Sequence, residues 1–157
     1  MKNKLIRGAL CLSLAMAILT PNASSAVVRD GWQKSSNQWY YYSQGLGVKN
    51  TWKKIGGTWY YFDRSGKMKT GWLKDRNKWY YLDASGSYAH NGWRKIGGYW
   101  YHFKADGSMS VGWIEDHHRI HIYYANPSGR IIINKIVKID GRDCYFNKSG
   151  EAHEADA

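Results

Sequence analysis

Along most of this chain, apolar and aromatic residues fall in pairs of short runs, and two turn-forming residues separate the runs of each pair. One such unit is Trp52–Ile55, then Gly56-Gly57, then Thr58–Phe62. A Gly-Gly pair between two aromatic or β-branched runs is a signal for a β-hairpin with a two-residue turn. No stretch beyond the N-terminal leader keeps a helical period, so the pattern predicts an all-β chain of hairpins.

The hairpin unit recurs at a nearly fixed period. Each first strand begins with a tryptophan, here called the outer tryptophan, and each second strand carries an inner tryptophan. The outer tryptophans follow one another at steps of 20, 20, 21 and 20 residues, and they are Trp32, Trp52, Trp72, Trp93 and Trp113. The inner tryptophans are Trp39, Trp59, Trp79 and Trp100. A lone hairpin is marginal in water, so we expect an all-β solenoid, a superhelix of stacked hairpins of about 20 residues each.

The repeat pattern decays after Trp113. Ile122 stands where an inner tryptophan is expected, and in the last unit Val137 and Cys144 are assigned to the outer and inner positions. Solenoids need atypical terminal units, so these degenerate repeats are predicted to form a C-terminal cap. The polar, acidic end from Glu151 to Ala157 is expected to be loose.

The N-terminus has the pattern of a secretory signal peptide. Lys2, Lys4 and Arg7 precede an apolar run over residues 9–19, and small residues lead up to Ala26. The run is too short to cross a bilayer comfortably, so cleavage near Ala26 is expected, with no membrane span afterwards. The predicted domains are a signal peptide over residues 1–26 and a repeat module of about six hairpins over residues 27–157.

Charge and cysteine content change the picture in two ways. The leader holds three of the 23 basic residues and none of the 12 acidic ones, so the exported part would carry a net charge of +8. It keeps only Cys144, so no internal disulfide can form and the fold must rest on packing or on ligand. Basic charge with many aromatic residues is also typical of nucleic-acid binding, but export and the fixed pairing of the rings argue against that class.

The repeated tryptophan pairs need a reason beyond packing, because the terminal units show that aliphatic residues pack at the same positions. The face of a tryptophan ring attracts a cation by roughly 0.5–2 kcal/mol. Two tryptophans of one hairpin and a tyrosine of the next would form three walls of a box. An aromatic cage of this kind recognises quaternary ammonium groups.

The pattern G-W-x-K-x-x-x-x-W-Y-Y-x-D-x-x-G-x-M-x-T-G-W resembles the choline-binding repeat of Gram-positive surface proteins and lytic enzymes. It is clearest in Trp52–Trp72, Gly71–Tyr81 and Gly92–Phe103. The resemblance implies a hairpin superhelix that binds choline, displayed on teichoic acids or lipoteichoic acids of the wall, between successive hairpins. It also implies non-covalent attachment of a secreted protein to the bacterial surface, and it allows a homodimer through terminal repeats.

Carried over position by position, the resemblance places four choline sites. The predicted ligand-binding residues are Trp32, Trp39 and Tyr60; Trp52, Trp59 and Tyr80; Trp72, Trp79 and Tyr101; and Trp93, Trp100 and Tyr123, with Met68 and Met109 closing two of the boxes. Tyr88 stands at the position that matches these methionines. The sequence leaves open which tyrosine of each pair faces the ligand, and whether two extra residues displace Tyr123. A fifth site would have only Trp113 with Tyr145, and we do not expect it to bind.

Other functions have weaker support. The acidic residues are scattered over turns and no nucleophile has a recognisable setting, so neither an enzyme nor a cofactor is predicted. The cluster of His117, His118 and His121 beside Asp116 has poor strand geometry for a metal site. The main alternative is a carbohydrate-binding module, since related repeats in glucan-binding proteins and clostridial toxins bind sugars. A third alternative is an adhesin that choline only holds on the wall.

Overall fold

The computed structural model describes residues 29–116 and 120–154. The expected signal peptide over residues 1–26 lies outside these ranges and stays a prediction. The described residues contain strands and no helix, which confirms the all-β prediction. The strands are β1 (Gly31–Ser35), β2 (Gln38–Ser43), β3 (Leu46–Gly47), β4 (Thr51–Ile55), β5 (Thr58–Phe62), β6 (Gly71–Asp75), β7 (Lys78–Leu82), β8 (Gly92–Ile96), β9 (Tyr99–Phe103), β10 (Gly112–Glu115), β11 (Ile122–Ala125), β12 (Lys135–Ile139), β13 (Arg142–Phe146) and β14 (Ala152–Glu154).

Each successive pair of long strands is an antiparallel hairpin, and all but the β10–β11 hairpin have the expected two-residue turn. In the second hairpin Trp52 pairs with Tyr61 and Ile55 pairs with Thr58, which leaves Gly56 and Gly57 as the turn. These two glycines have φ angles of 55° and 86°. Two consecutive positive φ angles define the turn whose twist matches that of the flanking strands. The turns of the first and third hairpins reach the same left-handed region without glycine, through Ser36-Asn37 and Arg76-Asn77.

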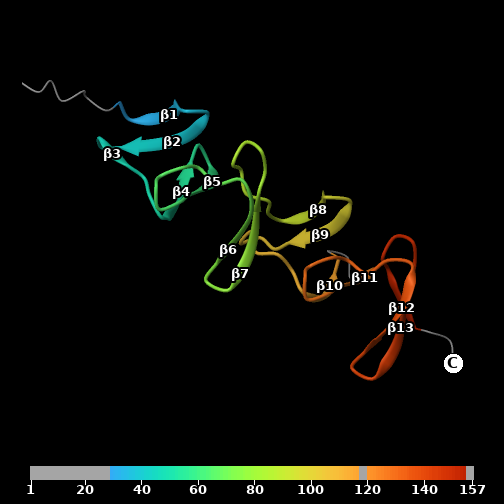
Figure 1. The fold of residues 1–157 in the computed structure, drawn as a ribbon. Helices are drawn as coiled ribbons and strands as arrows, with labels where there is room; N and C mark the ends of the chain where they lie inside the picture. Colours follow the sequence, from blue (N-terminus) through green and yellow to red (C-terminus); the bar gives the residue numbers. More distant parts are fainter. Residues whose placement is uncertain (1–28, 117–119, 155–157) are drawn as a thin grey trace, which may run out of the picture.

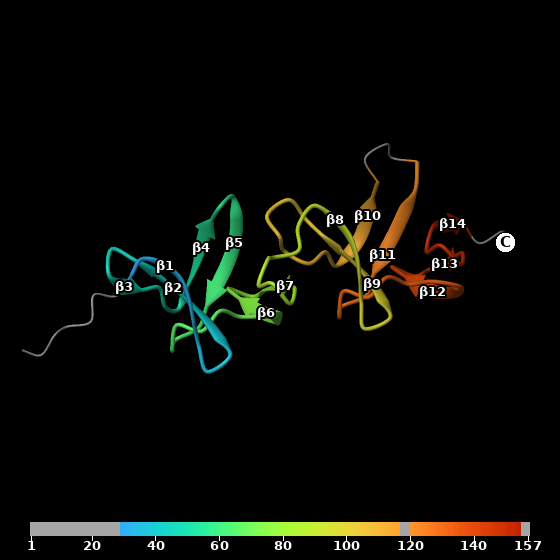
Figure 2. The ribbon, with the colours of Figure 1, turned by 90° about the horizontal axis from the view of Figure 1, so that it is seen from above.

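The hairpins follow one another along the molecule, and each is turned relative to the one before it (Figures 1 and 2). The loop that follows one hairpin is hydrogen-bonded back to the preceding hairpin in the stack, so the loop after the second hairpin bonds to the first. The Met68 backbone N–H donates to the Trp39 carbonyl at 2.8 Å, and Met109 makes the same bond to Trp79 at 2.7 Å. In the second to sixth hairpins the last residue of the second strand faces the interior and is completely buried: Phe62, Leu82, Phe103, Ala125 and Phe146. The predicted solenoid of stacked β-hairpins is therefore confirmed.

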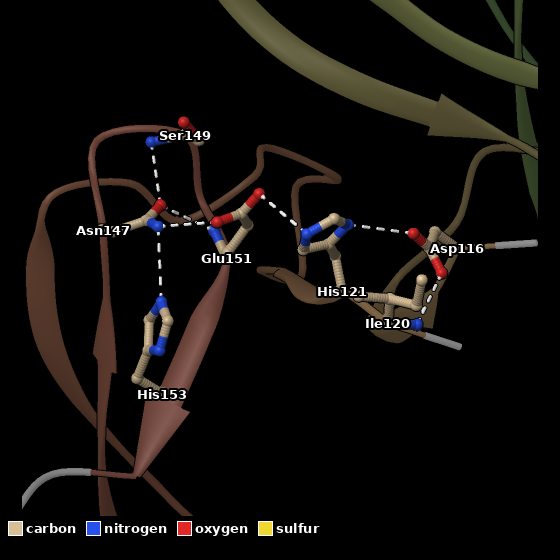
Figure 3. A network of polar contacts seen from close by, with 7 residues as sticks. All are labelled: Asp116, Ile120, His121, Asn147, Ser149, Glu151 and His153. Carbon is tan, nitrogen blue, oxygen red and sulfur yellow. Dashed lines mark hydrogen bonds and ion pairs between the residues drawn. The ribbon is translucent and has the colours of Figure 1, made fainter. Parts of the chain in front are cut away.

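Both ends of the described stack differ from its middle. The first hairpin gains the short strand β3 and the last gains β14, so each terminal sheet has three strands. The expectation of a loose end from Glu151 is wrong for Ala152–Glu154, because these residues pair with β13. His121, in the loop between β10 and β11, links this end to the fifth hairpin (Figure 3). Its ring nitrogens lie 3.0 Å from Asp116 and 3.6 Å from Glu151.

The strand register of the last hairpin corrects the sequence assignment. Ile136 pairs with Tyr145, as each outer tryptophan pairs with the second tyrosine of its hairpin, so the outer position is Ile136 and not Val137. Asp143 occupies the inner position, and Cys144 stands at the first tyrosine of the pair. The sequence assignment was wrong by one residue. Ile136 and Val137 are adjacent and both aliphatic, so the hydrophobic pattern alone does not show which of them takes the outer position.

A search of the described residues finds no helix that is both long enough and apolar enough to cross a membrane.

Candidate functional site

The third of four similar aromatic sites shows how the hairpins build a cage. Trp72 and Trp79 lie on neighbouring strands of one hairpin, with ring centroids 6.3 Å apart and planes at 86°. Tyr101 comes from the following hairpin, with its ring 4.8 Å from Trp72 at 61°. Three rings that are steeply inclined to each other form walls rather than a stack. Together with Met109 they line a cavity of about 380 Å³.

The structure brings the other predicted triplets together in the same way. In the first cage the Trp32 ring lies 6.2 Å from Trp39 and 4.9 Å from Tyr60, at interplanar angles of 85° and 74°. In the second cage Trp52 lies 5.0 Å from Tyr80, and both rings line a cavity of about 220 Å³ with Trp59.

The fourth cage keeps its tyrosine despite the longer hairpin that supplies it. Trp93 lies 4.7 Å from Tyr123 at an angle of 64°. The extra residues fall between the end of β10 at Glu115 and the start of β11 at Ile122, and Trp113 still pairs with Tyr124. The displacement of Tyr123 that the sequence left open does not occur.

In the second to fifth hairpins the first tyrosine faces the outer tryptophan of the preceding hairpin, and the second, where there is one, packs against the outer tryptophan of its own hairpin. Tyr60 and Tyr61 are consecutive residues of β5 and therefore point to opposite faces of the sheet. Tyr60 contacts Trp32, whereas Tyr61 lies 5.3 Å from Trp52 of its own hairpin. The cage tyrosines are thus those that the sequence proposed, and the second members are part of the core packing.

A fourth wall comes from the residue after the glycine turn. Met109 lines the third cavity, and Tyr88 lines the second cavity with its ring 6.2 Å from Trp52. Met68 and Ile131 occupy the same position beside the first and fourth cages, where each backbone N–H donates to the carbonyl of the inner tryptophan. Sequence reasoning left Tyr88 and Ile131 out of the site. The signal for both was their position two residues after a turn glycine.

The exposure and the charge state of the cage rings suit the binding of a cation with diffuse charge. The inner tryptophans Trp39, Trp59, Trp79 and Trp100 are 38–44% exposed, although a ring that served only as core would be covered. The Trp52 indole N–H donates to Asp75 at 3.0 Å, which fixes the orientation of that outer ring. Burial raises the pKa of the Tyr80 and Tyr123 phenols, so both rings stay neutral at physiological pH. Such walls attract a diffuse positive charge through their ring faces.

The fifth position does not form a complete cage. Trp113 lies 5.0 Å from Tyr124 and 6.2 Å from Phe146, which are both core-packing partners. Ile122 replaces the inner tryptophan, and the register places Cys144, not Tyr145, at the position of the cage tyrosine. Two of the three walls are therefore missing.

No group of three or more potential metal ligands lies together among the described residues. His117 and His118, which belong to the histidine cluster considered from the sequence, lie outside the described residues.

This geometry defines a class of protein, the aromatic-cage hairpin solenoids, and the family comparisons agree with it. The family model described as Choline-binding repeat matches residues 48–93 and 90–135, and a cell wall binding repeat model matches residues 30–44. The chain belongs to the choline-binding repeat family. A search of curated proteins gave no match.

Several solved structures have a similar chain path. Choline binding protein F from Streptococcus pneumoniae is 38% identical with a TM-score of 0.69, and the match covers 80% of this chain and 41% of that one. CbpJ from the same species is 40% identical with the same TM-score and the same two coverages. The Cpl-1 endolysin of phage Cp-1, solved in complex with choline, is 36% identical with a TM-score of 0.56, over 80% of this chain and 37% of that one. The chain spans about two fifths of the length of these proteins.

Proposed function

We propose that this protein is a secreted, non-catalytic wall-binding protein that holds choline groups of teichoic or lipoteichoic acids in aromatic cages between successive hairpins. The ligand-binding residues are the four triplets named above, with Met68, Tyr88, Met109 and Ile131 as fourth walls. The observation that carries the proposal is the repetition of one geometry. In all four cages the outer tryptophan lies 4.7–5.0 Å from a tyrosine of the next hairpin, while the inner tryptophan stays open to solvent.

The energetics explain why the cage is repeated. Three rings contribute about 1–2 kcal/mol each, and the cost of association reduces a single cage to an affinity near millimolar. One such site would not hold a protein on a surface. A polymer with many choline groups engages several cages at once, and this raises the apparent affinity by roughly 10²–10⁴. The net positive charge of the chain adds a salt-sensitive attraction to the phosphates of the polymer.

The comparisons support a binding role at the Gram-positive wall. Relatives include proteins named for choline binding and an endolysin solved with a peptidoglycan analogue. In this chain all six described hairpins are accounted for as repeat units, and the walls of the cages are aromatic or apolar side chains. We therefore assign the described part of the chain to attachment and not to catalysis.

Retention on a diethylaminoethyl resin tests the proposal, because this tertiary amine mimics choline. A protein with net positive charge should flow through an anion exchanger. We expect retention that survives high salt and ends when free choline is added. Replacing Trp52 and Trp59 together by leucine should weaken retention. The control is Leu82→Val, which alters a fully buried residue that lines no cage.

Flow-through of the folded protein, together with retention on dextran or another glycan, would establish the carbohydrate alternative instead. The homodimer through terminal repeats stays a prediction, and sedimentation velocity with and without choline would test it.

A further inference from the structure

The mouths of the second and third cages are each built by a loop that lies two hairpins further along the chain. The third cage is formed by Trp72 and Trp79, and its cavity is also lined by Ser128 and Arg130 from the loop after the fifth hairpin. The second cage is likewise completed by Asp106, from the loop after the fourth hairpin. These loops have the same form: residues 104–108 and 126–130 both hold a glycine at the fourth position, with Asp106 and Ser128 at the third.

Because these loops differ in sequence, the mouths differ in charge. The third and fifth loop positions are Asp106 and Ser108 at the second cage, and Ser128 and Arg130 at the third. The equivalent positions are Ser85 and Ser87 in the loop after the third hairpin, and Ser149 and Glu151 in the loop after the sixth. The four cages share their tryptophan and tyrosine triplets, so the cages differ in the fourth wall and in the charge that this loop supplies.

The mouth of the second cage carries a carboxylate that is already paired. Asp106 accepts a hydrogen bond from the Lys78 ammonium at 2.9 Å and two from Ser108. These bonds, first from the Ser108 hydroxyl and then from Lys78, hold the pKa of Asp106 well below its usual range. The carboxylate is therefore ionised at neutral pH, and it neutralises the neighbouring ammonium.

The mouth of the third cage carries a single charged side chain among its described lining residues, the guanidinium of Arg130. Its central carbon lies 3.9 Å from the centroid of the Tyr99 ring. A guanidinium stacked on a ring keeps its N–H donors at its edge, where they can form paired hydrogen bonds to a phosphate. Ser128 adds a hydroxyl to the same cavity.

We propose that Arg130 makes the third cage selective for choline phosphate esters, with the guanidinium binding the phosphate while the aromatic walls hold the trimethylammonium group. The second cage, with Asp106 at its mouth, does not prefer the phosphate ester over free choline. This inference rests on the proposed choline-binding function and specifies the ligand at one of its sites.

The direction of the selectivity follows from charge. Arg130 repels the cation of free choline and therefore weakens its binding. In phosphocholine a short ethylene link joins the ammonium to a phosphate, which Arg130 attracts, so Arg130 strengthens the binding of this ligand. Asp106 attracts the cation and repels the phosphate, and its pairing with Lys78 reduces both effects. For an exposed, bidentate charge pair we expect a difference of about 3- to 10-fold in Kd.

Nuclear magnetic resonance of the indole N–H groups measures each cage separately. Trp79 reports the third cage and Trp59 the second, and phenylalanine variants assign their signals. Titration with choline and with phosphocholine gives the ratio of the two dissociation constants at each cage. We expect phosphocholine to be favoured about 3- to 10-fold more at the third cage than at the second.

Three variants and one control test the assignment. Arg130→Gln should abolish the preference of the third cage for phosphocholine, while choline binds as well or better. Arg130→Lys should keep part of the preference, because lysine has the charge but not the planar fork of arginine. Asp106→Asn should raise the phosphocholine preference of the second cage, because Lys78 loses its partner. Arg142→Gln removes an exposed arginine of β13 that lines neither cavity, and it should change neither ratio.

The outcomes separate this inference from the proposed function. If neither ligand shifts the indole signals, choline binding itself is wrong. If both cages bind choline and Arg130→Gln leaves the phosphocholine ratio unchanged, the proposed role of Arg130 is wrong. Choline-bearing teichoic acid and phosphatidylcholine vesicles carry the same headgroup. The source of the phosphate ester is the one that the wild-type protein binds and that the Arg130→Gln variant binds less well.

Discussion

Trp79→Ile is the most informative single change, because the chain already shows that isoleucine fits at this position. Ile122 is the equivalent residue of the fifth hairpin, and both side chains are 41% exposed. The variant should therefore keep the hairpin and remove only the aromatic wall. It loses the edge contact between Trp79 and Trp72, at 6.3 Å, which contributes about 0.5–1.5 kcal/mol to stability.

The expected effect on ligand binding is larger than the effect on the fold. One ring of three contributes roughly 0.5–2 kcal/mol to the binding of a cation, which corresponds to about 2- to 30-fold in the Kd for choline at the third cage. The assay is a choline titration followed by the indole signals of Trp72 and Trp52. The Trp72 signal should need more choline for half-saturation, and the Trp52 signal should respond as in the wild type. Trp79→Phe, which keeps a weaker π-face, should lie between.

Two results would refute this reasoning. Unchanged choline affinity at the third cage would mean that the inner tryptophan is packing and not a wall. An equal loss at the second cage would mean that the substitution acts through the whole stack. Thermal unfolding of the same variants distinguishes the second result from simple loss of fold.

Two further predictions concern the stack and the incomplete fifth cage. Gly107→Ala should destabilise the protein by about 2–4 kcal/mol, because φ is +79° and the new Cβ would lie 2.2 Å from the Tyr88 ring. Gly57→Ala is the control, because φ is +86° but nothing lies within 4 Å of the new Cβ. It should lower the free energy of unfolding, measured by chemical denaturation, by only about 1 kcal/mol. Equal losses of stability in the two variants would contradict the steric argument. Ile122→Trp combined with Cys144→Tyr should complete the fifth cage and add one choline equivalent by calorimetry; unchanged stoichiometry would show that more than the missing rings prevents binding.

The tryptophan triplets could be predicted because they depend on local geometry. Side chains alternate along a strand and the turn fixes the register of a hairpin, so Trp52 and Trp59 must share a face once Gly56-Gly57 is recognised as the turn. The period of the repeat then limits the third wall to one of two adjacent tyrosines in the next unit. Those inferences need no knowledge of how one hairpin is rotated on the next.

Other features depended on contacts that the pattern does not contain. The last hairpin, with Ile136 and Val137 side by side, has no tryptophan to fix its register, and backbone pairing decides it. Strand β14 forms because β13 offers an unpaired edge, although its own residues are polar.

The cage mouths show the division most clearly. The sequence alone determined the hairpins, their period and the paired tryptophan walls, because these follow from spacing within one unit. Contacts between hairpins decided which tyrosine forms the third wall. Only the tertiary structure decided that Asp106 lies at the second cage and Arg130 at the third. The physical reason is that the superhelical rotation carries each loop back over a cage two hairpins away, and packing between units sets that rotation.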